Sequence, residues 1–117
     1  MIAAHPGGGR IGKRFYVITA VPTETADRRA GATAAHLEWL EALGKAGQLL
    51  LAGPFVAEDG VSTGGGMFII RSASQAEAER IAATDPYNAG GYRRFTVAPW
   101  RLDQASSALV PLLSAQD

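Results

Sequence analysis

Residues 33–55, TAAHLEWLEALGKAGQLLLAGPF, predict a helix that leads through one glycine into a strand. At about 100° per residue, Leu40, Leu43 and Gly47 lie close to one line, and the acidic side chains lie opposite. Gly47 suits the helix C-cap because glycine enters left-handed conformations at little cost. QLLLAGPF is short, nearly all apolar and closed by Gly-Pro, which is typical of a buried strand.

The flanking sequence supplies the remaining elements. Ser74 and Glu77 form the S-x-x-E signature of a helix N-terminus, and this second helix should end near Thr84, before Pro86. Residues 56–66, VAEDGVSTGGG, predict a turn-rich connection. β-branched and aromatic residues predict three further strands, at residues 13–21, 67–72 and 92–102.

The element order is therefore β-α-β-β-α-β, which predicts an α+β, ferredoxin-like fold with a four-stranded antiparallel sheet. Right-handed crossovers place both helices on one face. The strands that contain Pro54 and Pro99 should lie at the edges, because proline cannot donate to a strand ladder. We expect a flexible N-terminal lead at residues 1–12, one domain at 13–103, and a weakly apolar C-terminal tail at 104–117.

The strands are apolar on both faces, although the helices cover only one. Phe15 and Val17 alternate with Tyr16 and Ile18, for example. A bare apolar face is unusual in a soluble monomer, so we predict a homodimer of the dimeric α/β-barrel type, joined sheet to sheet. The alternative is that the C-terminal tail folds back over this face.

Composition limits the possible partners. The 117 residues carry 11 basic and 11 acidic side chains, so no excess charge favours nucleic acid. No apolar run approaches a membrane span, and the N-terminus lacks a signal-peptide pattern. The chain has no cysteine and only two histidines, one of them the tail residue His5, so metal binding is not expected. A cytoplasmic protein without membrane or nucleic-acid partners is the expectation.

His36 lies within the apolar stripe of the first helix, where an imidazole needs a hydrogen-bond partner. A core histidine bonded to a carbonyl is one interpretation, and a functional histidine is the other. Asp85 precedes a proline at a helix end, which is common turn chemistry. Arg93 and Arg94 could meet an anion, but adjacent strand residues face opposite sides, so at most one of them could serve a given site. We therefore interpret both as surface charge. The glycines of GVSTGGG lead into a strand, so they do not form a phosphate-binding loop.

Together these motifs resemble the YciI-like (YCII-related) family. HLEWLEALGKAGQLLLAGPF, the capped S-x-x-E-A helix, DPYNAGGY and FTVAPW carry the resemblance over residues 14–102. It implies a ferredoxin-like dimer with a histidine and an aspartate as a catalytic pair, which map onto His36 and Asp85. Family members often have an arginine three residues before the histidine, whereas this chain has Thr33. The resemblance therefore does not imply that residue 33 binds an anion in this chain.

The resemblance suggests an activity, because the family includes a dehydrochlorinase of a chlorinated hydroxyquinol. We hypothesise a small enzyme without cofactors, in which Asp85 orients His36 as general base for elimination or isomerisation of a small organic molecule. The predicted substrate-binding residues are Gly53, Phe55, Tyr87, Gly90 and Trp100. The alternative is a non-catalytic dimeric module that binds a small ligand or a partner. Oxygen chemistry, known in other dimeric ferredoxin-like proteins, has no specific support in this sequence.

Overall fold

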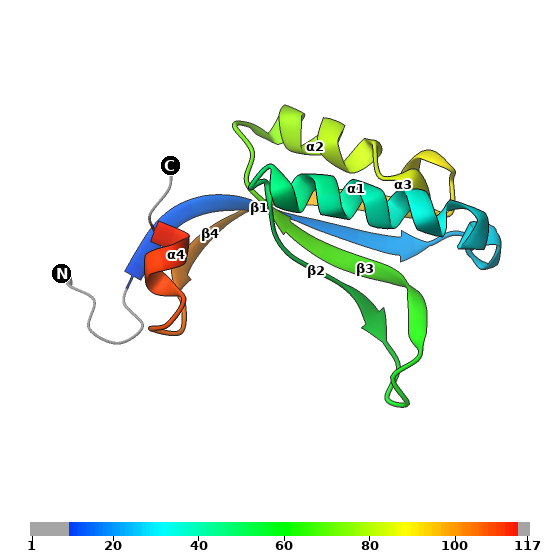
Figure 1. Ribbon diagram of the computed structural model, residues 1–117, viewed down its shortest axis with the longest axis horizontal. Coiled ribbons are helices and arrows are strands. Elements are labelled where there is room, and N and C mark those ends of the chain that lie inside the picture. Colours follow the sequence, from blue (N-terminus) through cyan, green and yellow to red (C-terminus); the bar gives the residue numbers. More distant parts are fainter. Residues whose placement is uncertain (1–9, 115–117) are drawn as a thin grey trace. The chain divides into compact units, whose positions relative to one another are not determined.

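The computed structural model describes residues 10–114 (Figure 1). His5 and the predicted lead up to residue 9 lie outside the described residues, as do residues 115–117. The elements are β1 (Arg10–Pro22), the 3-10 helix η1 (Ala26–Ala32), α1 (Thr33–Lys45), β2 (Leu49–Val56), β3 (Ser62–Ile70), α2 (Gln75–Ala83), α3 (Pro86–Ala89), β4 (Arg93–Gln104) and α4 (Val110–Ser114).

The chain forms two compact units. Tyr16–Pro99 is the larger, and it contains the helices α1 to α3, the strands β2 and β3, and most of β1. The other unit comprises the first residues of β1, the end of β4, and α4. β1 begins at Arg10, inside the segment that we predicted as a flexible lead. The boundaries of the predicted domain remain a prediction.

The sheet has the order β2-β3-β1-β4. β3 pairs antiparallel with both of its neighbours; Val17 lies opposite Ile69, and Gly53 lies opposite Met67. The strands with an internal proline, β2 and β4, are therefore at the edges, as predicted, and the strands without an internal proline are central. The α+β, ferredoxin-like class with a four-stranded antiparallel sheet is confirmed.

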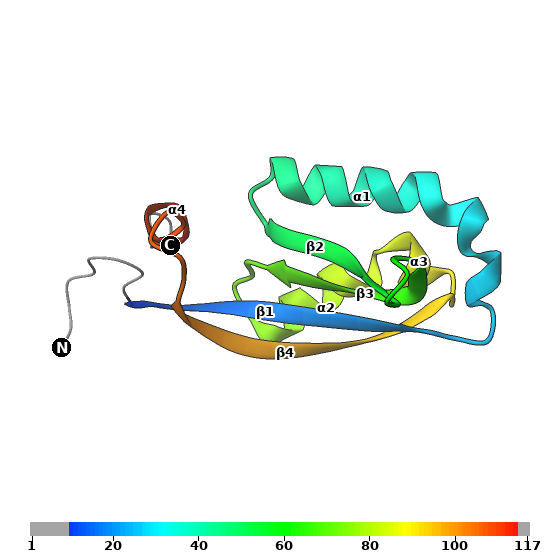
Figure 2. The same cartoon turned by 90° about the horizontal axis from the view of Figure 1, so that it is seen from below.

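Both long helices lie on the same side of the sheet (Figures 1 and 2). The core between them and the sheet consists of alternate strand residues and small residues of α2. Its buried members are Tyr16, Ile18, Phe68, Ile70, Ala78 and Ala82. Trp39 and Leu40 of α1 pack against this cluster, as do Phe95 and Val97 of β4. The inward face predicted for the first helix is therefore confirmed, and it directs the first turn of α1 toward the end of α2.

The helix ends follow local chemistry. Gly47 follows the last turn of α1 with φ +77°, and the Ser74 hydroxyl accepts a hydrogen bond from the Glu77 amide at 3.1 Å. We expected Pro86 only to stop α2. Instead it is the first residue of a further short helix, α3, because proline has no amide hydrogen to lose at that position.

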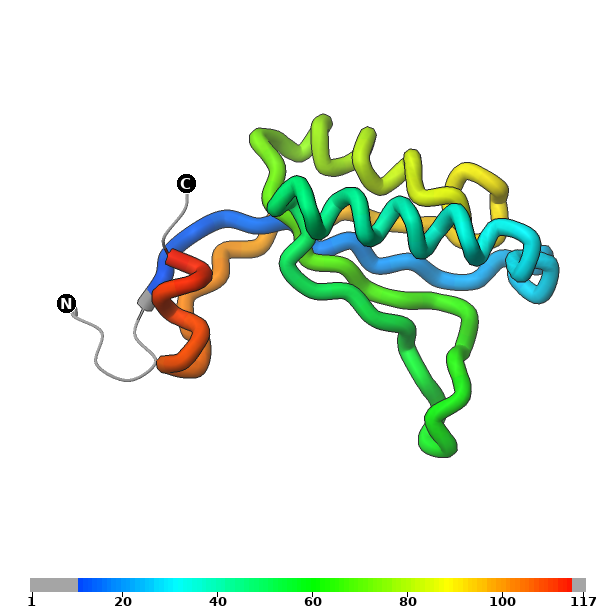
Figure 3. The backbone as a smooth tube through the Cα atoms, viewed as in Figure 1, coloured from blue at the N-terminus to red at the C-terminus, as the bar shows by residue number. Residues whose placement is uncertain are grey.

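The predicted connection at residues 56–66 is too long. β2 continues to Val56 and β3 begins at Ser62, so only residues 57–61 form the hairpin turn (Figure 3). The glycines 64–66 are strand residues because the neighbouring backbones approach them closely. A Cβ on Gly65 would lie 2.4 Å from the carbonyl oxygen of Ala20, and one on Gly66 would lie 2.9 Å from that of Gly53.

Substitution Gly65→Ala should therefore lower the free energy of unfolding, by about 1–3 kcal/mol as for other overpacked sites. The added methyl meets backbone of β1, which cannot rotate away as a side chain could. The matched control is Gly53→Ala, because a Cβ there has no heavy atom within 4 Å. Urea unfolding of both variants measures the difference; equal stabilities would contradict the close approach.

Candidate functional site

His36 is the fourth residue of α1 and is 7% exposed. The stripe that buries Leu43 and packs Leu40 on the core also carries the imidazole inward. Its Nδ1 lies 2.7 Å from Oδ1 of Asp85. The partner is therefore a carboxylate and not the backbone carbonyl that an ordinary core histidine would use.

Asp85 is fully buried and has two roles. It is the N-cap of α3, since Oδ1 accepts a hydrogen bond from the Tyr87 amide at 3.0 Å. The same oxygen receives the His36 contact, while Oδ2 has no hydrogen-bond partner. The turn chemistry predicted for the Asp-Pro pair is therefore present together with the histidine contact. Because a carboxylate can only accept, the Nδ1 of His36 carries the proton of this hydrogen bond.

Tyr87 fixes the plane of the imidazole. The two rings are stacked, with centroids 4.0 Å apart and an interplanar angle of 16°. The tyrosine hydroxyl is 2.8 Å from Oγ1 of Thr33. The Trp39 ring is also stacked with the imidazole, with ring centroids 6.2 Å apart, and its indole N–H donates to the Thr84 hydroxyl at 2.9 Å. The imidazole is therefore held at one edge and across its face, which leaves Nε2 as the nitrogen available to a ligand.

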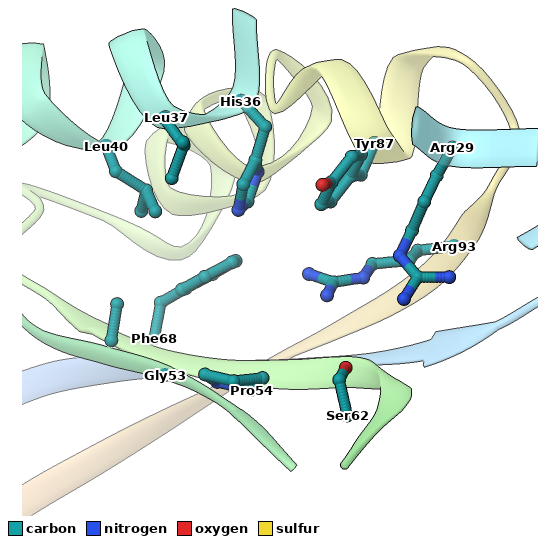
Figure 4. Close-up of a pocket in the computed structure, with 11 residues that line it drawn as sticks. Arg29, His36, Leu37, Leu40, Gly53, Pro54, Ser62, Phe68, Tyr87 and Arg93 are labelled. Carbon is teal, nitrogen blue, oxygen red and sulfur yellow. The ribbon is translucent and has the colours of Figure 1, made fainter. Parts of the chain in front are cut away.

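A cavity of about 380 Å³ adjoins this ring (Figure 4). Such a volume is at the small end of ligand sites. One end is apolar, with Leu37 and Leu40 of α1, and Phe68 of β3 forms part of the wall. The opposite end carries Arg29 and Arg93. The remaining lining residues are His36, Ala52, Gly53, Pro54, Ser62 and Tyr87.

Arg93 corrects our interpretation of this residue as surface charge. It is only 6% exposed, whereas its neighbour Arg94 is exposed. The guanidinium lies 4.7 Å from the Tyr87 ring centroid, and Nε donates to the Gly64 carbonyl at 2.8 Å. Burial lowers the pKa of Arg93; Asp85 and Tyr87 counteract this effect, and the nearby positive charge of Arg29 adds to it. An arginine nevertheless stays protonated near neutral pH.

The other predicted substrate-binding residues divide into two groups. Gly53 and Tyr87 line the cavity. Phe55 instead lines a hollow with Met67 and Ile69, and the space beside Gly90 is filled by the Tyr92 ring, 2.6 Å from where a Cβ would lie. Trp100 belongs to the other unit. None of these three residues lines the cavity. Their surroundings depend on tertiary packing, which a linear motif does not reveal.

The arginines are functional candidates that sequence reasoning set aside, in the case of Arg93, or missed, in the case of Arg29. A signal existed for Arg93, because Phe95 and Val97 pack on the helix side and the alternation of a strand places Arg93 on the same side. No comparable signal existed for Arg29. It enters from η1, a polar 3-10 segment without a periodic pattern, and its NH1 group donates to the Ala26 carbonyl at 2.8 Å.

The described part of the chain contains no group of three or more His, Asp or Glu residues arranged to hold a metal ion. Within residues 10–114, no helix combines the length and apolar character that crossing a membrane requires.

Comparison with known proteins agrees with this architecture. The solved structure of 5-chloro-2-hydroxyhydroquinone dehydrochlorinase (TftG) from Burkholderia phenoliruptrix AC1100, in complex with 2,5-dihydroxybenzoquinone, is similar, with 21% identity and a TM-score of 0.61. The similarity covers 74% of this chain and 92% of that one. A structure of an antibiotic biosynthesis monooxygenase has 15% identity and a TM-score of 0.42, covering 80% and 99%. The likeness to the dehydrochlorinase structure indicates a shared fold.

No curated protein sequence matches the chain. A family match does exist: residues 14–101 match the YCII-related domain. This segment includes both His36 and Asp85 as well as every residue that lines the cavity. Since the match extends over most of its length, the chain belongs to the YCII-related domain family.

Proposed function

We propose that the protein is a small enzyme in which His36 acts as general base on a small organic substrate. The observation that carries the proposal is the 2.7 Å hydrogen bond between His36 Nδ1 and Asp85, beside a cavity that the same histidine lines. Asp85 is a positioning residue, since it is fully buried and acts through the imidazole. Tyr87 is a second positioning residue through its stacking contact.

Proton abstraction follows from this arrangement. The carboxylate keeps the proton on Nδ1, so Nε2 is free to accept a proton from substrate. The positive charge that then develops on the ring is stabilised by the carboxylate. In this scheme the imidazole performs the transfer alone, and no cofactor is needed.

We propose elimination or isomerisation as the reaction. In an elimination, a proton moves from a carbon or hydroxyl of the substrate to Nε2. The electron pair left behind forms a carbon–carbon or carbon–oxygen double bond, and chloride leaves with the pair of the broken carbon–chlorine bond. In an isomerisation, the proton returns to a different atom. The structural similarity to a dehydrochlorinase makes a chlorinated hydroquinone a reasonable first substrate to test.

The test is to incubate the protein in D₂O with chlorinated hydroquinones and with compounds that carry an acidic C–H. Ion chromatography measures chloride release, and NMR measures deuterium incorporation into substrate. We expect either chloride release or deuterium incorporation to be faster with the protein than without it. If neither rises above the uncatalysed rate across the panel, general-base catalysis by His36 is the wrong assignment.

A non-catalytic, ligand-binding module is the second candidate. The observation that favours it is the N-cap bond from Asp85 to the Tyr87 amide, which gives the carboxylate a structural role. In that case the His36–Asp85 pair ties α1 to α3, and the cavity binds a ligand without converting it.

We further propose that the protein is a homodimer joined through the sheet face that α1 and α2 do not cover. Leu51 is 65% exposed there and Met67 is 38% exposed. With Phe55 and Ile69 they line a hollow of about 230 Å³. An apolar patch of this kind is typical of an interaction surface. A second copy presents the same patch and so provides a matching surface.

Substitution Met67→Glu should dissociate this dimer, because it places a charge in the apolar interface. Light scattering coupled to size exclusion should give twice the chain mass of 12.2 kDa for wild type and the single mass for the variant. The matched control is Val61→Glu in the hairpin turn, which should remain dimeric. A monomeric wild type would contradict the proposal and favour coverage by the C-terminal tail.

A further inference from the structure

Two arginines share one end of the cavity without a carboxylate between them. Figure 4 shows the guanidinium groups of Arg29 and Arg93 together, with Leu37 and Leu40 toward the other end. Among residues 10–114, neither guanidinium forms an ion pair with an acidic side chain. Asp85 is the acidic group that acts on the charge of Arg93, but its Oδ1 already accepts hydrogen bonds from His36 and from the Tyr87 amide.

The donors of these arginines are only partly used. Arg93 donates one hydrogen bond from Nε to the Gly64 carbonyl, and Arg29 donates one from NH1 to the Ala26 carbonyl. A guanidinium has five N–H groups, so several remain on each side chain. The Tyr87 ring lies against Arg93 and backbone holds its Nε, so this fork is fixed before any ligand arrives.

Like charges close together in a half-apolar cavity are unfavourable unless an anion compensates them. Burial lowers the pKa of Arg93; the buried Asp85 and Tyr87 counteract this, and the positive charge of Arg29 adds to it as the smallest of these effects. An anion bound between the guanidinium groups would relieve this repulsion. A carboxylate suits the planar fork, because it accepts two parallel hydrogen bonds.

We propose that Arg29 and Arg93 form a carboxylate-binding subsite, and that the substrate is a small carboxylic acid with an apolar, ring-sized body. The body would occupy the end lined by Leu37, Leu40 and Phe68, and the intervening atoms would face His36. This inference rests on the proposed function for the statement that the ligand is a substrate. The subsite itself is defined by the two arginines.

The test is the affinity of benzoate, measured by isothermal titration calorimetry at constant ionic strength. Benzoate has no leaving group, so its binding reports the subsite and not the chemistry of His36. An inactive protein that binds benzoate through the arginines would therefore overturn the proposed function and leave the subsite intact. Benzamide, the neutral isostere, should bind about tenfold more weakly or worse.

Each cavity arginine has another arginine next to it in the sequence, and this neighbour provides a matched control variant. Arg29→Gln and Arg93→Lys should each weaken benzoate binding by roughly 10- to 100-fold, as for a lost charge-assisted hydrogen bond. Arg28→Gln and Arg94→Gln remove exposed neighbours and should change the affinity less than about twofold. Arg29 is only half-buried, so its variant gives the result even if Arg93→Lys is destabilised.

Three results would overturn the subsite. One is equal affinity for benzoate and benzamide, and another is equal effects of the cavity and control variants. The third concerns inorganic phosphate, which has no ring to bury. Displacement of benzoate by phosphate at similar concentration would indicate a general phosphate site instead of a carboxylate subsite for an apolar acid.

Discussion

Substitution His36→Gln should lower kcat on an identified substrate by about 10²- to 10⁴-fold, the usual contribution of a general base. Glutamine is polar and similar in length, but its amide does not accept a proton near neutral pH. Because the cavity wall is otherwise retained, KM should change little. Chloride release or deuterium incorporation provides the rate, and circular dichroism verifies the fold.

The companion variant Asp85→Asn separates positioning from simple packing. An asparagine oxygen can still accept from the Tyr87 amide, so α3 keeps its N-cap. The ring of His36 loses the charge that stabilises its protonated form, and kcat should fall while KM is retained. A purely structural pair would give the opposite outcome: folded His36→Gln and Asp85→Asn proteins with wild-type turnover.

Substitution His36→Ala should lower the free energy of unfolding by about 1–3 kcal/mol, the usual cost of leaving a buried hydrogen-bonding group without its partner. Asp85 would keep only its contact with the Tyr87 amide, and its Oδ2 already has no partner. Most of this cost is therefore the unpaired carboxylate and not the lost imidazole packing.

A double-mutant cycle tests this explanation. In the His36→Ala background, Asp85→Asn should be nearly neutral or stabilising, whereas in wild type it should be destabilising. Urea unfolding gives the four free energies. Leu37→Ala is the neighbouring control, since Leu37 is 58% exposed and should cost far less. If the effects of His36→Ala and Asp85→Asn simply add, the two side chains are not coupled.

Much of the fold could be predicted from local chemistry. Gly47, Ser74 and the prolines of β2 and β4 act through backbone rules that need no knowledge of distant residues, and the structure agrees with each of them. The glycines 64–66 were misassigned for the same reason. Their composition is that of a turn, but close contact with neighbouring strands makes them part of β3.

The candidate site was predicted less evenly. Family motifs pointed to His36 and Asp85, and the structure brings the two side chains into contact. Phe55 and Gly90 are close to cavity residues in sequence, yet one faces the hollow shared with Met67 and the other is packed against Tyr92. Neighbouring strand residues point in opposite directions, so proximity along the chain is a weak guide to a shared cavity.

The sequence by itself determined the order of the four strands and the two long helices, the edge strands and the inward face of α1, because periodicity, capping and proline chemistry act over a few residues. Only the tertiary structure decided that Asp85 contacts His36, that Tyr87 stacks on the imidazole, and that Arg29 and Arg93 meet at one end of the cavity. These groups come from segments far apart in the chain. Their distances depend on how the helices pack on the twisted sheet, and no local pattern encodes that packing.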